Sequence, residues 1–269
     1  MTDDQTDDER MRLGREQLTR LNPRGEADMH EALDAIAPDM PGLVVAFGFG
    51  DIVSRPGLAL PDRETATIAA LASLGNAEPQ LRFHIGGGLS VGLSAQEIVE
   101  IIYVTSVFAG FPAGLNALFA ARKVFEARGL RPQAQDTAPP ASAGADRRAR
   151  GLAALEATSR GSGQAVLESL ADIAPDMAAF ILDFAYGDVI ARPGLSLRRK
   201  ELAMIAACVA RGTMRPQLKV HVKAGLNVGL TQQELVEAVM QMAVYAGFPA
   251  AINGLIALRE ALGEAGQTG

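Results

Sequence analysis

The feature that most constrains this chain is an internal repeat with a period of 137 residues. The phrase PQLRFHIGGGLSVGL at 79–93 returns as PQLKVHVKAGLNVGL at 216–230, and IAPDM, RPGL and AGFPA recur at the same spacing. Such a repeat within 269 residues indicates two copies of one structural unit. We therefore predict a first unit over 11–130 and a second over 148–265. The intervening segment at 131–147 is rich in Pro, Ala and Gly, which is typical of a linker.

Both copies are predicted to be helical throughout, which gives an all-α fold class. The segments LSAQE and LTQQE have the pattern of capping boxes, in which Ser94 or Thr231 precedes a glutamate by three residues. Apolar residues then recur at helical spacing, and no alternating strand pattern bounded by hairpin dipeptides is found. A glycine triplet at 86–88 interrupts one predicted helix. Its last member, Gly88, matches Gly225, so we expect close helix packing there.

Composition and charge argue against several classes of protein. A net charge of −6 offers no basic field for nucleic acid or anionic lipid, and no apolar run reaches the roughly 18 residues that span a bilayer. The first residues, MTDDQTDDER, lack the basic and then apolar order of a secretory signal, so we expect a cytoplasmic protein. The single cysteine, Cys208, excludes an internal disulfide, and we expect it to be a buried, inert thiol.

Few polar residues are retained in both copies within apolar helices, and these are the candidate functional residues. His30 is not among them, because Leu167 stands at the matching position. The retained pairs are Arg55/Arg192, Glu64/Glu201, Gln80/Gln217, His84/His221 and Asn116/Asn253.

A glutamate beside a histidine can transfer protons, since the carboxylate orients an imidazole that titrates near neutral pH. The alternative is a buried hydrogen bond that only ties two helices together, and the residues alone leave both interpretations open. Arg55, Arg192, Asn116 and Asn253 have a comparable alternative as helix-end or turn residues. Metal and phosphate-loop motifs are absent from the sequence, so no metal or other cofactor is expected.

The motifs taken together resemble those of a known family. Residues 187–255 combine RPGL, a glutamate, the pattern H-x-x-x-G/A-L-x-x-G, a capping box and Y-A-G-F-P. This run is similar to a carboxymuconolactone decarboxylase domain, and residues 50–118 resemble it more loosely. The likeness implies two such helical units, which share the alkylhydroperoxidase D-like fold.

The resemblance also implies an activity. It suggests a cofactor-independent decarboxylase acting on a small carboxylated unsaturated lactone or enone. Glu64, His84, Glu201 and His221 would then carry acid–base catalysis. Substrate-binding positions would be Arg55, Gln80, Asn116, Arg192, Gln217, Tyr245 and Asn253.

Two other functions are compared with this one. Thiol peroxidases of the same fold place two cysteines before the histidine, but this chain has Ala77 and Gln80 in one copy and Met214 and Gln217 in the other. Without those thiols a disulfide-cycling peroxidase cannot operate. A catalytically silent assembly or binding protein remains an alternative.

The resemblance further suggests unequal copies and a defined assembly. The second copy keeps Tyr245 and Lys223, where the first has Phe108 and Gly86, so we expect it to hold the more competent site. Single-copy relatives form rings of helical units. We therefore expect the two copies to pack as a pseudo-dimer, and three chains to form a homotrimer. A monomeric pseudo-dimer is the alternative.

Overall fold

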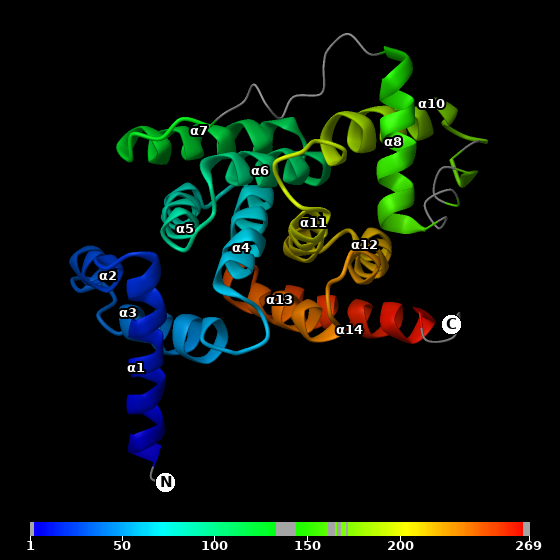
Figure 1. The fold of residues 1–269 in the computed structure, drawn as a ribbon. Helices are drawn as coiled ribbons and strands as arrows, with labels where there is room; N and C mark the ends of the chain where they lie inside the picture. The colour runs from blue at the N-terminus through cyan, green and yellow to red at the C-terminus, as the bar shows by residue number, and fades with distance from the viewer. Residues whose placement is uncertain (1–2, 133–143, 161–164, 166–167, 171, 266–269) are drawn as a thin grey trace.

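The computed structural model describes residues 3–132, 144–160, 165, 168–170 and 172–265 (Figure 1). Strands are absent from these residues, and the all-α prediction is confirmed. Most of the predicted linker, 133–143, lies outside them. The first copy consists of α1 (Asp3–Leu21), α2 (Gly25–Leu33), α3 (Met40–Leu43), η1 (Val44–Val53), α4 (Leu60–Leu74), α5 (Glu78–Ser90), α6 (Ala95–Ala109) and α7 (Phe111–Ala127).

The second copy repeats this order. Its described helices are α8 (Gly144–Ser159), α10 (Pro175–Phe180), η3 (Ile181–Ile190), α11 (Leu197–Arg211), α12 (Arg215–Asn227), α13 (Gln232–Tyr245) and α14 (Phe248–Ala265). Within the described part of the chain, no helix is long and apolar enough to cross a membrane.

Both predicted capping boxes are present. The Glu97 backbone N–H donates to the Ser94 hydroxyl over 3.1 Å, and the Ser94 N–H donates to the Glu97 carboxylate over 2.9 Å. Thr231 and Glu234 repeat the arrangement at 3.2 and 2.8 Å. These bonds satisfy backbone donors at the starts of α6 and α13.

The sequence patterns did not predict that η1 and η3 are π-helices. In each, the N–H after the helix bonds to a carbonyl five residues back, from Ser54 to Phe49 and from Ala191 to Tyr186. The neighbouring helices α1 and α8 approach these segments closely. A Cβ atom at Gly14 would overlap the carbonyl oxygen of Val45, and the matching Gly151 has the same relation to Leu182. Glycine is therefore required where these backbones meet.

The expected close packing at the third glycine of the triplet is confirmed. A Cβ atom on Gly88 would lie 3.0 Å from the Leu93 side chain and 3.3 Å from Ile68 of α4. At Gly225 the corresponding distances are 3.0 Å to Leu230 and 3.4 Å to Ile205. Each glycine thus lets the histidine-bearing helix approach the helix that carries the glutamate.

The centre of the molecule is the contact between α4 and α11, which lie side by side in Figure 1. Residues 62–73 of α4 and 200–210 of α11 are all buried. Many are alanines, which allow the two helices to approach closely. Helix α6 of the first copy also packs on α11, and α13 of the second packs on α4. The two copies therefore share one core, as the pseudo-dimer prediction required.

Charged side chains cross between the copies at the edges of this core. Arg55 donates to Glu237 of α13 at 2.9 Å, and the matching Arg192 pairs with Glu100 of α6 at 2.9 Å. Both glutamates are buried. Arg63 also donates to Glu237, at 3.0 Å, from a fully buried position. These pairs constrain the register of the two copies, because a shifted register would leave a buried carboxylate unpaired.

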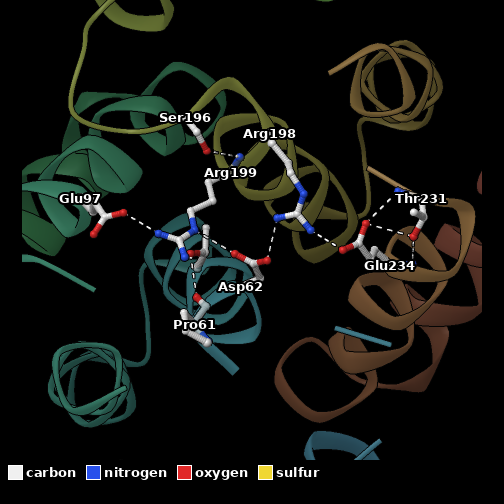
Figure 2. A network of polar contacts seen from close by, with 9 residues as sticks. Pro61, Asp62, Glu97, Ser196, Arg198, Arg199, Thr231 and Glu234 are labelled. Atoms are coloured by element: carbon white, nitrogen blue, oxygen red, sulfur yellow. Dashed lines mark hydrogen bonds and ion pairs between the residues drawn. The ribbon is translucent and has the colours of Figure 1, made fainter. Parts of the chain in front are cut away.

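A further ionic network lies between α4 and α11, and Figure 2 shows it from close by. Asp62 accepts hydrogen bonds from Arg198 at 2.7 Å and from Arg199 at 2.8 Å. Arg199 reaches on to Glu97 and Arg198 to Glu234. Asp62 and Arg199 occupy matching positions of the repeat. The pseudo-twofold contact therefore joins opposite charges, where two identical copies would place like charges together.

We expect Arg199→Asp to destabilise the protein by about 2–3 kcal/mol, below the range for a fully buried pair because Arg199 is partly exposed. The reason is that the new carboxylate would lie beside Asp62 and Glu97. The double variant Glu97→Gln/Arg199→Asp removes one of these two like-charge contacts, while glutamine can keep the capping box with Ser94, and it should recover about 1 kcal/mol of this loss. Urea unfolding measures both.

The matched control is Arg12→Asp, which breaks exposed pairs with Glu9 and Glu16 and should cost less than about 1 kcal/mol. A double variant no more stable than Arg199→Asp alone would contradict the importance of charge complementarity.

Candidate active site

Each predicted glutamate and histidine come together on adjacent helices. Glu64 lies on α4 and His84 on α5, with the histidine Nδ1 2.9 Å from a carboxylate oxygen. Glu201 on α11 and His221 on α12 repeat the contact at 2.8 Å. All four side chains are buried, with at most 9% of any side chain exposed. The contact forms because the chain reverses at Gly75 and Gly212, left-handed residues that end α4 and α11.

The hydrogen bond determines which ring nitrogen can act on a ligand. A carboxylate accepts from Nδ1–H, so the neutral ring keeps its proton on Nδ1 and leaves Nε2 as an acceptor. The protonated ring can also donate from Nε2. Both histidines are therefore oriented for proton transfer through Nε2.

Aromatic rings from the opposite copy complete each pair. The Tyr245 ring of α13 lies 5.0 Å from the His84 ring, and the Phe108 ring of α6 lies 5.1 Å from His221, both nearly edge to face. Tyr245, predicted as a residue of the second site, thus lies beside the histidine of the first copy. Burial raises the pKa of the Tyr245 phenol and the Glu64 carboxylate adds to the rise, so this hydroxyl stays protonated.

A cavity of about 450 Å³ opens beside His221. Its polar wall consists of Ser169, Tyr186, Gln217 and His221. Burial, assisted by the Glu201 carboxylate, raises the pKa of Tyr186, so its phenol stays protonated, and it shares a hydrogen bond with Thr158. The apolar wall includes Val107, Leu155, Leu170, Ile181, Ala185 and Ile190. Because Val107 and Phe108 belong to the first copy, both copies build this site.

The corresponding position in the first copy is occupied by a larger side chain. Phe83 matches Val220, which lines the cavity, and its ring lies 5.0 Å from His84. Phe83 packs against the buried cluster of Leu18, Leu21 and Phe49. It thus takes up space beside His84 that the smaller Val220 leaves open beside His221.

The remaining predicted residues lie in different surroundings. Gln80 and Gln217 are both exposed, and Gln217 also lines the cavity beside His221. Arg55 and Arg192 are held by the glutamates of the opposite copy, and Arg192 also covers the Tyr103 ring at 4.8 Å.

Asn116 and Asn253 are not brought to either histidine. They are exposed and line two other hollows, of about 320 and 210 Å³. Lys223 pairs with Glu264 over 2.8 Å.

The sequence analysis did not identify Tyr186 as a residue of the cavity wall. Its matching position in the first copy is Phe49, so a search for polar residues retained in both copies does not select it.

Cys208 is buried as expected, and burial raises the pKa of its thiol to about 12. Among the described residues, no group of three or more His, Cys, Asp or Glu could hold a metal ion.

Comparison with known proteins identifies a matching family model, the carboxymuconolactone decarboxylase family, at residues 38–123 and again at 175–260. A 4-carboxymuconolactone decarboxylase of Acinetobacter baylyi is 32% identical over 47% of this chain and 95% of its own length. A nitrosuccinic acid decarboxylase of Metarhizium robertsii is 30% identical over 31% of this chain and 58% of its own.

A solved structure resembles nearly the whole chain. It is a protein of Burkholderia xenovorans described as a candidate γ-carboxymuconolactone decarboxylase subunit, with a TM-score of 0.56 and 26% identity. The match covers 95% of this chain and 98% of that one. The likeness therefore extends over both copies.

We expect the neutral forms of His84 and His221 to carry their proton on Nδ1. Long-range ¹H–¹⁵N correlation spectra distinguish the two tautomers. An amide can either donate or accept at Nδ1, so Glu201→Gln should perturb the His221 signals and leave those of His84 unchanged. Glu64→Gln should perturb the His84 signals and leave those of His221 unchanged. Observation of His221 protonated at Nε2 alone in the wild type would contradict the assigned orientation.

Proposed function

Because this chain belongs to the carboxymuconolactone decarboxylase family, we propose that it is a cofactor-independent decarboxylase-like enzyme whose main site is the cavity beside His221. Its substrate would be a small carboxylated unsaturated lactone or enone. The observation that carries the proposal is a histidine oriented by a buried carboxylate on the wall of a ligand-sized cavity. Decarboxylase names among the relatives support the same class of reaction.

The chemistry needs a place for the electrons that remain when CO₂ leaves. In such a substrate the carbon–carbon bond to the carboxylate breaks and its electron pair moves through the double bond to the ring carbonyl, giving a dienolate. A protonated His221 can donate from Nε2 to this oxygen and then deliver the proton to carbon. Glu201 holds Nδ1 throughout and stabilises the imidazolium. Solvent restores the proton that carbon takes up.

Tyr186 gives the site a second donor. Tyr186 lines the same cavity as His221, and its neutral phenol shares a hydrogen bond with Thr158. By turning from Thr158 the phenol can hydrogen-bond the developing oxyanion without supplying a charge. Arg55 and Arg192 have no part in this mechanism, because each is held by a buried glutamate of the opposite copy. The cavity beside His221 favours an enzyme over a silent assembly protein, in which a Glu–His pair would only tie two helices together.

We expect His221→Ala to lower decarboxylation by about 10²–10⁴-fold, the usual contribution of a general acid. His84→Ala should cost less, because Phe83 occupies space beside that ring. CO₂ release from a panel of unsaturated lactone and enone acids measures both. His30→Ala is the control, since His30 is half-exposed and bonds only to the nearby Asp34. A variant ranking in which His84→Ala abolishes turnover and His221→Ala does not would contradict the assignment of the main site.

Assembly is proposed on the exposed apolar side chains. They fall into two sets at matching positions of the repeat. Ring contacts between Phe47 and Phe248 at 5.5 Å and between Phe111 and Phe184 at 5.7 Å bring the two copies together at these sets, and we infer that each set forms one cluster. The exposed members are Ile36, Met40, Leu43, Phe248 and Ile252 in one cluster, and Ile173, Met177, Phe180, Phe111 and Leu115 in the other. Exposed apolar clusters of this kind mark interaction surfaces.

Two such clusters per chain would allow one chain to contact the next around a closed ring. We therefore expect a homotrimer, and light scattering at working concentration should give about three times the 28.2 kDa of one chain. Phe180→Glu should shift the mass toward a single chain, because it places a charge in the middle of one cluster. A wild-type mass near 28.2 kDa would refute the trimer.

A further inference from the structure

The wall of the cavity beside His221 has an unusual charge balance for a site that binds acids. The described residues that line it include no Lys and no Arg. The segments outside the described residues contain no Lys or Arg in their sequence either. Among the described residues that line the cavity, His221 is therefore the one group that can carry a positive charge, and its ring is hydrogen-bonded to Glu201.

From this balance we propose that the site takes a mono-acid with an apolar body and discriminates against substrates that carry a second carboxylate. The inference rests on the function proposed above, and it assigns the one tolerated carboxyl group to the polar end of the cavity. That end holds His221, Gln217 and Tyr186, and the apolar body would lie along Leu155, Ile181 and Ile190.

Two cations close to Ile190 of the apolar wall are already bound elsewhere. Arg192 pairs with Glu100, and the Lys200 ammonium donates to the carbonyl of Ile190 at 2.7 Å and to that of Arg192. Lys200 is fully buried, and this burial lowers its pKa to about 8. Neither side chain lines the cavity.

The cations of α12 are also engaged. Arg215 pairs with Glu260 of α14, and Lys219 and Lys223 both pair with Glu264. These residues line a different hollow, which shares only Pro216 and Val220 with the cavity beside His221. A second carboxylate in the cavity would therefore meet apolar side chains without a counter-charge.

The energetic consequence is a strong preference for ligands that carry a single carboxylate. An ionised carboxylate loses its hydration on entering an apolar site, and the loss is large unless a cation or several donors replace the water. The polar end can supply donors to one carboxyl group through the Gln217 amide and, for a ligand that has no ring carbonyl, through His221 as well. A second group, attached along the apolar body, has no such partners. Each additional carboxylate should thus weaken binding by at least tenfold.

A matched pair of unreactive probes tests the inference without depending on turnover. The probes are 3-phenylpropanoic acid and phenylsuccinic acid, which adds one carboxyl group to the same skeleton. We expect isothermal titration calorimetry to show one 3-phenylpropanoate per chain, with phenylsuccinate binding at least tenfold more weakly. Equal or tighter binding of phenylsuccinate, or no binding of either probe, would overturn the proposal.

Two variants locate the binding. Val220→Phe introduces the residue of the first copy and should abolish 3-phenylpropanoate binding, whereas Leu152→Phe, on the exposed face of α8, should not. Ile181→Lys adds a cation to the apolar wall and should raise phenylsuccinate affinity at least tenfold. Binding that survives Val220→Phe, or an Ile181→Lys variant with unchanged selectivity, would overturn the assignment.

These measurements separate the inference from the proposed function. Selective binding of the mono-acid together with full turnover in His221→Ala would leave the binding class intact and refute only the catalytic proposal. Loss of turnover in His221→Ala together with preferential binding of the diacid would refute the binding class and leave the catalytic proposal intact.

Discussion

The burial of α4 against α11 is the contact on which the rest of this structure depends. Each helix is covered on nearly all sides, and each belongs to a different copy. Neither could remain helical in water with so much apolar surface exposed, so each copy needs the other. The same two helices carry Glu64 and Glu201. Formation of the shared core therefore positions both carboxylates, and the helices that follow bring the histidines to them.

Buried charge gives this apolar contact a defined register. The cross-copy pairs contribute little net stability, because desolvation offsets much of their attraction. A displaced register, however, would leave Glu100 and Glu237 buried without their arginines, at a cost of about 3–5 kcal/mol for each broken pair. The aromatic neighbours of the histidines depend on this register, since Tyr245 and Phe108 both reach across from the opposite copy.

Much of the fold could be predicted from the sequence, because its determinants are local. Serine and threonine caps, helical periodicity and the 137-residue repeat identify the helices and the duplication. The π-helices could not be predicted in this way, because no local pattern distinguishes them from α-helices. They lie where α1 and α8 approach closely through Gly14 and Gly151. Which side chains meet across elements, such as Arg55 with Glu237, was likewise beyond reach.

For the site, the repeat selected the right glutamates and histidines but could not show that they touch. It also assigned Tyr245 to its own copy, since a repeat alignment carries no information about which copy a side chain faces. The pairing of Arg55 and Arg192 with glutamates depends on the same cross-copy packing. Phe83 and Val220 occupy matching positions of the repeat, and only the structure relates their difference in size to the space beside each histidine.

The opposite charges of Asp62 and Arg199 have a consequence for how such a chain can evolve. A symmetric dimer of identical subunits must accept every mutation twice, once on each side of its axis. Here, one half carries the acid and the other the base, so two first halves facing each other would place Asp62 against Asp62. The halves are no longer interchangeable, and the gene fusion cannot be reversed to a self-pairing single unit without further mutation. Freed from symmetry, each half can change alone, and one histidine site can be filled while the other stays open.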